Sequence, residues 1–227
     1  MTKPRFRIFS PRPAGLAALL LCIQLALPAS AASLDDLLNA AKLGDAREVA
    51  ELVAKGMDPN SSDQSGNTLL ILAAREEQPA VVAELIKQRG VRLDARNAAG
   101  DSALMLAALR GYTGIAEQLL KAGAPFEHAG WNPMLYAAFE GRSAIVDLLL
   151  AKGASPDALA PNGSSALMFA ARNGHEEVVA RLLKAGANLN LKNDQGETAE
   201  SWALKYRNTD IAELIGAERK ARTARSK

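Results

Sequence analysis

Side chains that commonly carry acid–base or metal chemistry are scarce in this 227-residue sequence. Its only histidines are His128 and His175, and its single cysteine is Cys22. A catalytic or metal site needs several such groups to converge, yet no HExxH, Gly-Lys-Ser or GxSxG pattern occurs. Acidic pairs such as Glu176 and Glu177 are typical of solvated helix surfaces. We therefore predict no enzyme activity, no catalytic residue, no metal and no cofactor.

Aromatic side chains, which serve recognition, gather around one shortened segment. Eight aromatic residues follow residue 31, and four of them lie between Phe126 and Phe139. The segment 123–132, "GAPFEHAGWN", contains His128 and Trp131 and places its two glycines seven residues apart. Elsewhere the interval is ten residues, at Gly56–Gly66, Gly90–Gly100, Gly153–Gly163 and Gly186–Gly196. Because Trp, Tyr and Arg dominate the energy of many interfaces, this segment is a candidate for binding.

The shortened segment belongs to a repeat. Alanine pairs recur at steps of 33, 34, 30 and 33 residues, at Ala40-Ala41, Ala73-Ala74, Ala107-Ala108, Ala137-Ala138 and Ala170-Ala171. Hydroxyl residues suited to cap a helix precede four apolar runs, at Thr68, Ser102, Ser165 and Thr198. A second run in each unit, such as 176–184, places apolar residues on one helical face. The pattern predicts a solenoid of helix pairs that pack closely through alanine.

The fullest copy, "NGSSALMFAARNGHEEVVARLLKAGANLNLKN" at 162–193, resembles the ankyrin repeat. The resemblance implies an all-α ankyrin-repeat solenoid of stacked helix–turn–helix units joined by short β-hairpins, with two degenerate copies as caps. It covers six copies within 32–217, at about 33–62, 63–96, 97–128, 129–159, 160–192 and 193–217. The sequence departs from the family where a Pro and a His are usual, and apolar residues such as Ile71 and Met105 are expected to pack there instead.

Residues 1–31 have the features of a secretory signal peptide. A basic start precedes the apolar run Ala14–Leu27, and "PASAA" then offers small residues for cleavage after Ala31. An uncleaved N-terminal membrane anchor is the alternative. Cleavage would remove Cys22 and leave 23 basic against 25 acidic side chains, so the exported chain would be slightly acidic. We expect location in the periplasm or, alternatively, secretion.

The last ten residues, 218–227, form a basic segment with five bases and one acid. We expect this segment to be a frayed, solvated tail. The body before it is acidic, which argues against a nucleic-acid partner, and no membrane insertion of the exported chain is expected.

The resemblance implies that a protein partner binds the concave surface of a monomeric solenoid. Some similar periplasmic proteins are associated with catalase or peroxide defence, which makes a catalase or another oxidative-stress protein a candidate partner. The alternatives are an immunity protein or inhibitor that silences a periplasmic toxin or enzyme, a secreted host-directed effector, and a structural scaffold.

Within that surface, we predict an aromatic recess beside the shortened hairpin. Trp131 stands where the sibling copies have polar residues, and Phe139 follows an alanine pair, so both are predicted to be exposed anchors. The predicted polar rim, with the nearby histidine, consists of Arg110, Glu140, Arg172 and His128. The neighbouring Phe126 and Tyr136 are expected in the core.

Overall fold

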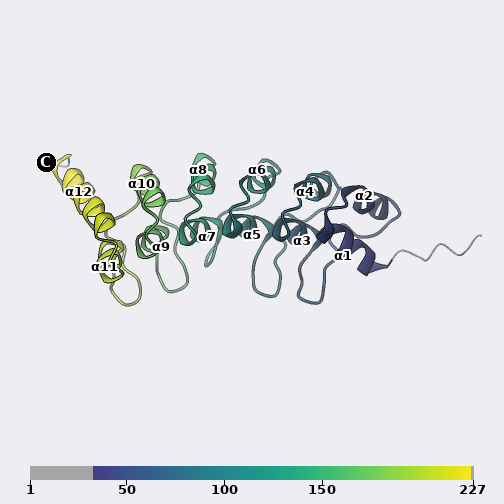
Figure 1. Cartoon of the computed structure of the whole chain (residues 1–227), viewed down its shortest axis with the longest axis horizontal. Helices are drawn as coiled ribbons and strands as arrows, with labels where there is room; N and C mark the ends of the chain where they lie inside the picture. The colour runs from purple at the N-terminus through teal and green to yellow at the C-terminus, as the bar shows by residue number, and fades with distance from the viewer. Residues whose placement is uncertain (1–32, 226–227) are drawn as a thin grey trace, which may run out of the picture. The chain divides into compact units, whose positions relative to one another are not determined.

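The computed structural model describes residues 33–225, and in this part of the chain twelve helices form six consecutive pairs (Figure 1). The pairs are α1 Leu34–Leu43 and α2 Ala46–Ala54, α3 Leu69–Arg75 and α4 Pro79–Leu85, α5 Ala103–Arg110 and α6 Thr113–Lys121, α7 Pro133–Phe139 and α8 Ser143–Ala151, α9 Ala166–Asn173 and α10 Glu176–Lys184, and α11 Ala199–Lys205 and α12 Thr209–Arg225. The predicted all-α solenoid is confirmed. The predicted signal peptide and its predicted cleavage site after Ala31 lie outside the described residues.

The predicted helix starts are confirmed by the capping geometry. The hydroxyl oxygens of Thr68, Ser102 and Ser165 accept hydrogen bonds from the backbone N–H three residues ahead, at 3.2–3.3 Å. Each oxygen satisfies one of the N–H groups that a helix leaves without an internal partner. The shortened repeat uses Asn132 in the same way, with a bond of 3.1 Å from Leu135 N–H.

The core is continuous because each helix contacts its counterpart in the next pair. First helices pack in the order α1, α3, α5, α7, α9, α11, and second helices pack in a parallel row (Figure 1). The alanine pairs of these first helices are almost completely buried, as are the apolar residues Ile71 and Met105 that replace the usual polar positions. No helix within residues 33–225 is long and apolar enough to cross a membrane.

His175 joins neighbouring repeats instead of forming a chemical site. It precedes α10, and its Nε2 lies 2.9 Å from the carbonyl oxygen of Phe139 at the end of α7. In the next repeat, Asn208 occupies the equivalent position and donates to the carbonyls of Ala171 and Arg172 at 2.9 Å. Both side chains satisfy carbonyl groups that the preceding first helix leaves free.

The prediction of a frayed basic tail is wrong for residues 218–225, which continue α12. Arg222 donates from Nη1 to Ala187 O at 2.7 Å and from Nη2 to Leu183 O at 2.8 Å. Its Nε also bonds Glu218 within the same helix. The guanidinium thus satisfies one carbonyl oxygen in the last turn of α10 and one just after that helix, and these bonds hold the segment in place.

Candidate functional site

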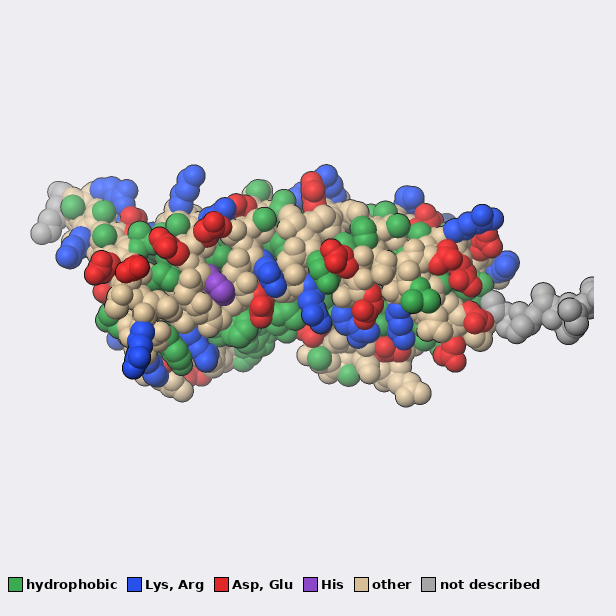
Figure 2. Space-filling view, in the orientation of Figure 1, with side chains coloured by type: hydrophobic (Ala, Val, Ile, Leu, Met, Phe, Trp, Pro, Cys, Tyr) green, Lys and Arg blue, Asp and Glu red, His purple; other side chains and the backbone are tan. Residues whose placement is uncertain are grey.

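Six aromatic side chains form a connected row along the first helices of the last three repeats. We call this set the aromatic row, and its members are Trp131, Tyr136, Phe139, Phe169, Trp202 and Tyr206. Ring centroids of neighbouring members lie 5.1–6.3 Å apart, within the range of favourable aromatic contacts. Figure 2 shows hydrophobic side chains gathered along the hairpin side of the molecule over α7 and α9.

Repeat spacing creates this row. Tyr136, Phe169 and Trp202 are separated by 33 residues each and therefore occupy the same position on α7, α9 and α11. Trp131 enters from the loop before α7 and contacts Tyr136 at 5.1 Å and Phe169 at 5.2 Å. Since the stacked first helices bring equivalent positions side by side, one aromatic residue per repeat becomes a contiguous set of packed rings, of which Phe169 and Trp202 are buried.

Hydrogen bonds fix the polar ends of two members. The Tyr136 hydroxyl donates a hydrogen bond of 2.8 Å to Oδ1 of Asp101, which ends the second hairpin directly before α5. Burial, together with this bond, raises the pKa of Tyr136 to about 12. Trp202 Nε1 donates to Glu197, whose other oxygen accepts from Lys205 Nζ at 2.6 Å. The bonds from Lys205 and Trp202 lower the pKa of Glu197 to about 2.

Arg172 lies against the C-terminal part of the row. Its guanidinium carbon is 4.9 Å from the ring centroid of Tyr206 and 5.6 Å from that of Trp202. These distances place it within the range of cation–π attraction. Within residues 33–225, the Arg172 side chain makes no hydrogen bond or ion pair, so its N–H groups remain available.

The structure brings together some of the predicted site residues. Trp131 and Phe139 are in edge-to-face contact at 6.3 Å, and Arg172 belongs to the same surface. Trp131 and Phe139 are both half-buried, however, so the prediction that these two anchors are exposed is wrong; three rings pack around the Trp131 indole. Tyr136 is also half-buried and lies within the row, not within the core as predicted.

The other predicted residues lie around or away from the row. Glu140 caps the end of α7 and pairs with Arg142 at 3.8 Å. Arg110 is exposed at the end of α5. His128 lies in the shortened hairpin, where its Nδ1 is 3.1 Å from Ala129 O. Phe126 is half-buried against the core.

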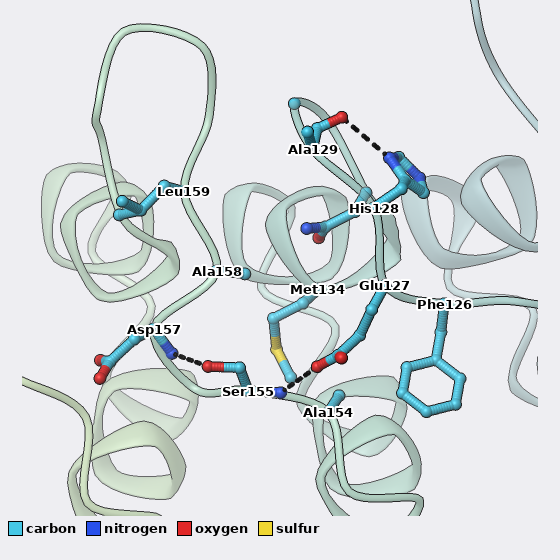
Figure 3. Close-up of a pocket in the computed structure, with 12 residues that line it drawn as sticks. Phe126, Glu127, His128, Ala129, Met134, Ala154, Ser155, Asp157, Ala158 and Leu159 are labelled. Atoms are coloured by element: carbon cyan, nitrogen blue, oxygen red, sulfur yellow. Dashed lines mark hydrogen bonds between the residues drawn. The ribbon is translucent and has the colours of Figure 1, made fainter.

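A separate hollow of about 450 Å³ lies between the third hairpin (residues 123–132) and the fourth hairpin (residues 153–163), and His128 is one of the residues that line it (Figure 3). Glu127 Oε1 accepts a hydrogen bond from Ser155 N at 2.8 Å across its base, where Met134 reaches down from α7. The third hairpin is visibly shorter than its neighbours in Figure 1, and the hollow lies beside it. Trp131 and Phe139 are not among the residues that line this hollow, so it is not the aromatic recess that the sequence predicted.

The residues of this site offer little support for a catalytic or metal-binding role. No group of three or more His, Cys, Asp or Glu able to hold a metal occurs in the described part of the chain. The row instead combines the buried rings of Phe169 and Trp202 and several partly exposed rings with an available guanidinium, and aromatic residues and Arg are the types typical of binding hot spots.

Sequence reasoning missed Trp202 and Tyr206 as members of the site. Their signal was the 33-residue spacing of Tyr136, Phe169 and Trp202, which marks one shared position in three successive repeats. We interpreted that position as core because Leu72, Leu106 and Phe169 share it, and Phe169 and Trp202 are indeed buried.

The fold and the aromatic row together define a scaffold for protein–protein interaction. The chain belongs to the ankyrin-repeat family: the model for ankyrin repeats (3 copies) matches residues 37–129, 90–160 and 134–224. Among curated relatives, a B-cell lymphoma 3 protein homolog from Mus musculus is 32% identical, with 70% of this chain and 37% of that protein covered. A putative ankyrin repeat-containing protein from Treponema pallidum is 27% identical, with 60% and 47% covered. The chain thus spans less than half the length of these two relatives.

Solved structures give the same fold. A chain from the complex of the Bd0816 predatory endopeptidase of Bdellovibrio bacteriovorus with immunity protein Bd3460 has a TM-score of 0.70 and 31% identity, covering 80% of this chain and 96% of that chain. The ankyrin repeat domain of Bcl-3 has a TM-score of 0.72 and 29% identity, covering 79% and 81%.

Proposed function

We propose that this protein is an exported inhibitor or immunity protein that binds and silences an enzyme of the periplasm or the secreted fraction. The observation that carries the proposal is the aromatic row with Arg172, a combination of residue types suited to recognition. The signal-like residues 1–31 support export.

The inhibitor function is favoured over the other candidates by one comparison. The complex that contains immunity protein Bd3460 includes a chain of which 96% aligns with this protein. A supporting role for a catalase or another oxidative-stress protein rests on family resemblance alone, and no feature of residues 33–225 favours it. Host-directed and scaffolding functions likewise have no specific support.

The test begins with the full chain, tagged after Lys227 and expressed in its producing cells. Intact mass should show an exported product that begins at Ala32 or Ser33, whereas an unprocessed product would contradict export. The partner captured with this product is then identified and its enzymatic activity measured with increasing amounts of the chain.

We expect activity to fall as the complex forms, and Phe139→Ala to weaken capture by tenfold or more, as removal of a hot-spot side chain does. Leu43→Ala is the matched control because Leu43 is 80% exposed at the end of α1, far along the repeat array from the row. A partner whose activity is unchanged or increased would overturn the inhibitor proposal.

A further inference from the structure

The rings of the aromatic row pack on one another through both faces and edges. Tyr136 and Phe169 both lie nearly parallel to Trp131, with interplanar angles of 30° and 31°. Phe139 and Trp202 each meet Phe169 edge-on, at 70° and 66°. Because the rings cover one another's faces, little free face remains for a sugar or a base to stack upon. Ring edges carry partial positive charge and favour oxygen acceptors.

The cation beside these edges is held ready for an acceptor. Two rings position the Arg172 guanidinium, while the nearest carboxylate that contacts the row, Glu197, is already bonded to Trp202 and Lys205. A guanidinium whose geometry is fixed loses little freedom when it forms a bidentate bond with a carboxylate.

Basic residues recur at the position that Arg172 occupies. Lys42, Arg75 and Lys205 hold the corresponding place, directly after the alanine pair or its equivalent, in three other repeats. In the two central repeats this place is apolar, with Leu109 and Phe139. The first helices therefore place basic residues on both sides of two central apolar positions, although Arg75 and Lys205 are ion-paired with Glu76 and Glu197 and residues 32–217 are acidic as a whole.

We propose that the surface binds an acidic, extended segment of a protein partner, in which an Asp or Glu side chain pairs with Arg172 and an apolar side chain packs beside Phe139. This proposal specifies the partner for the proposed function and rests on it. Neighbouring helices such as α7 and α9 pack with axes about 10 Å apart, and an extended chain advances about 3.3 Å per residue. The carboxylate and the apolar side chain should therefore be about three residues apart.

The test uses a phage library of random dodecapeptides selected on the protein purified from its producing cells. We expect enriched peptides to place Asp or Glu about three residues from a Leu, Phe or Trp. Arg172→Gln should weaken the synthetic peptides by about tenfold or more, as loss of a charge-assisted bond does. Arg172→Lys should retain part of the affinity, since it keeps the charge but loses the bidentate geometry.

Arg89→Gln is the control, because Arg89 is exposed in the second hairpin and outside the row. Melting curves show whether each variant is folded, and Arg172→Lys provides a milder second variant. Peptides amidated at the C-terminus retain binding if a side-chain carboxylate is recognised, whereas loss of binding on amidation would indicate a terminal carboxylate and overturn the assignment.

The outcomes separate this inference from the proposed function. Peptides that require Phe139 but bind Arg172→Gln normally would overturn the carboxylate assignment and leave the row as the binding surface. If Phe139→Ala leaves capture of the natural partner unchanged, the aromatic row is not the binding surface. Enrichment without acidic residues, or no enrichment, would also overturn the inference.

Discussion

The helices α5 and α9 show how one fold carries two different surfaces. Their sequences "ALMLAA" and "ALMFAA" differ at a single position, Leu106 in α5 and Phe169 in α9. Both helices begin at a serine cap, and both alanine pairs are buried. Yet Phe169 contacts three other rings, whereas Leu106 belongs to a half of the array with only one aromatic residue, Tyr112, between residues 33 and 125.

The third hairpin also differs from the others. The tips of the fourth and fifth hairpins are joined, with Asp194 N donating to Asn162 O at 3.0 Å. The first two are joined at their tips, where Ala98 N donates to Ser65 O at 2.9 Å and the Asn97 amide donates to Asn67 Oδ1 at 2.9 Å. The third hairpin reaches the fourth through Glu127 near its base. Packing positions thus maintain the stack, while tip length and the side chain at one inward position per repeat vary.

Replacement of the central ring should have the largest effect. Phe169 is 4% exposed, so Phe169→Ala should lower the free energy of unfolding by about 3–5 kcal/mol. Phe169→Leu, which restores the residue found in α5, should cost less than half as much. Denaturant titrations measure both variants, and equal losses for the two would show that the ring contacts do not distinguish the halves.

Trp131→Ala should cost about 2–3 kcal/mol in unfolding free energy, because a half-buried indole loses contacts with three rings. Trp131→Phe keeps a ring at the site and should recover much of the loss. Thermal and denaturant unfolding provide the measurement. A loss below about 0.5 kcal/mol, the size expected at an isolated surface position, would contradict the packing described.

Removal of the terminal cap should have a smaller effect. Arg222→Ala takes away bonds to two carbonyls of the preceding repeat and should reduce stability by about 1–2 kcal/mol. Arg225→Ala is the matched control, since the Arg225 side chain is 68% exposed and, within residues 33–225, its one ion pair is to Glu218, which Arg222 also contacts. That control should change stability by less than about 0.5 kcal/mol. Hydrogen exchange in α10 and α12 would localise the effect, and equal losses in both variants would argue against a cap.

The repeat period, helix starts and alanine packing could be predicted because they depend on local capping and on spacing along the chain. Thr68 and Ser165 illustrate this, since the sequence alone identifies each as an N-cap and the structure shows each capping its helix. The terminal helix could not be predicted in the same way. The bonds of Arg222 reach 35 and 39 residues back along the chain, and no local pattern records them.

The site was only partly predictable for a related reason. Trp131 and Phe139 stood out as departures from their sibling positions, and the structure places them together. Whether Tyr136 is core or surface depends on the rings around it, which come from a loop and two helices. His128 stood out by rarity alone, and rarity does not indicate which side of a hairpin a residue faces.

The smallest expected effect concerns Glu197, which occupies in the last repeat the position that Trp131 occupies in the fourth. Its pKa is about 2, below its usual value of 4.5, chiefly because Lys205 and then Trp202 donate to the carboxylate. A lowered folded-state pKa contributes stability above pH 4.5 that disappears as the pH falls through 2. Stability of the wild type should therefore decline more steeply than that of Glu197→Gln between about pH 4.5 and 2. Urea unfolding across this range measures the difference, and Lys205→Ala should raise the pKa of Glu197 in a carboxyl NMR titration. Parallel pH profiles for wild type and Glu197→Gln would mean that the carboxylate does not anchor this end of the aromatic row.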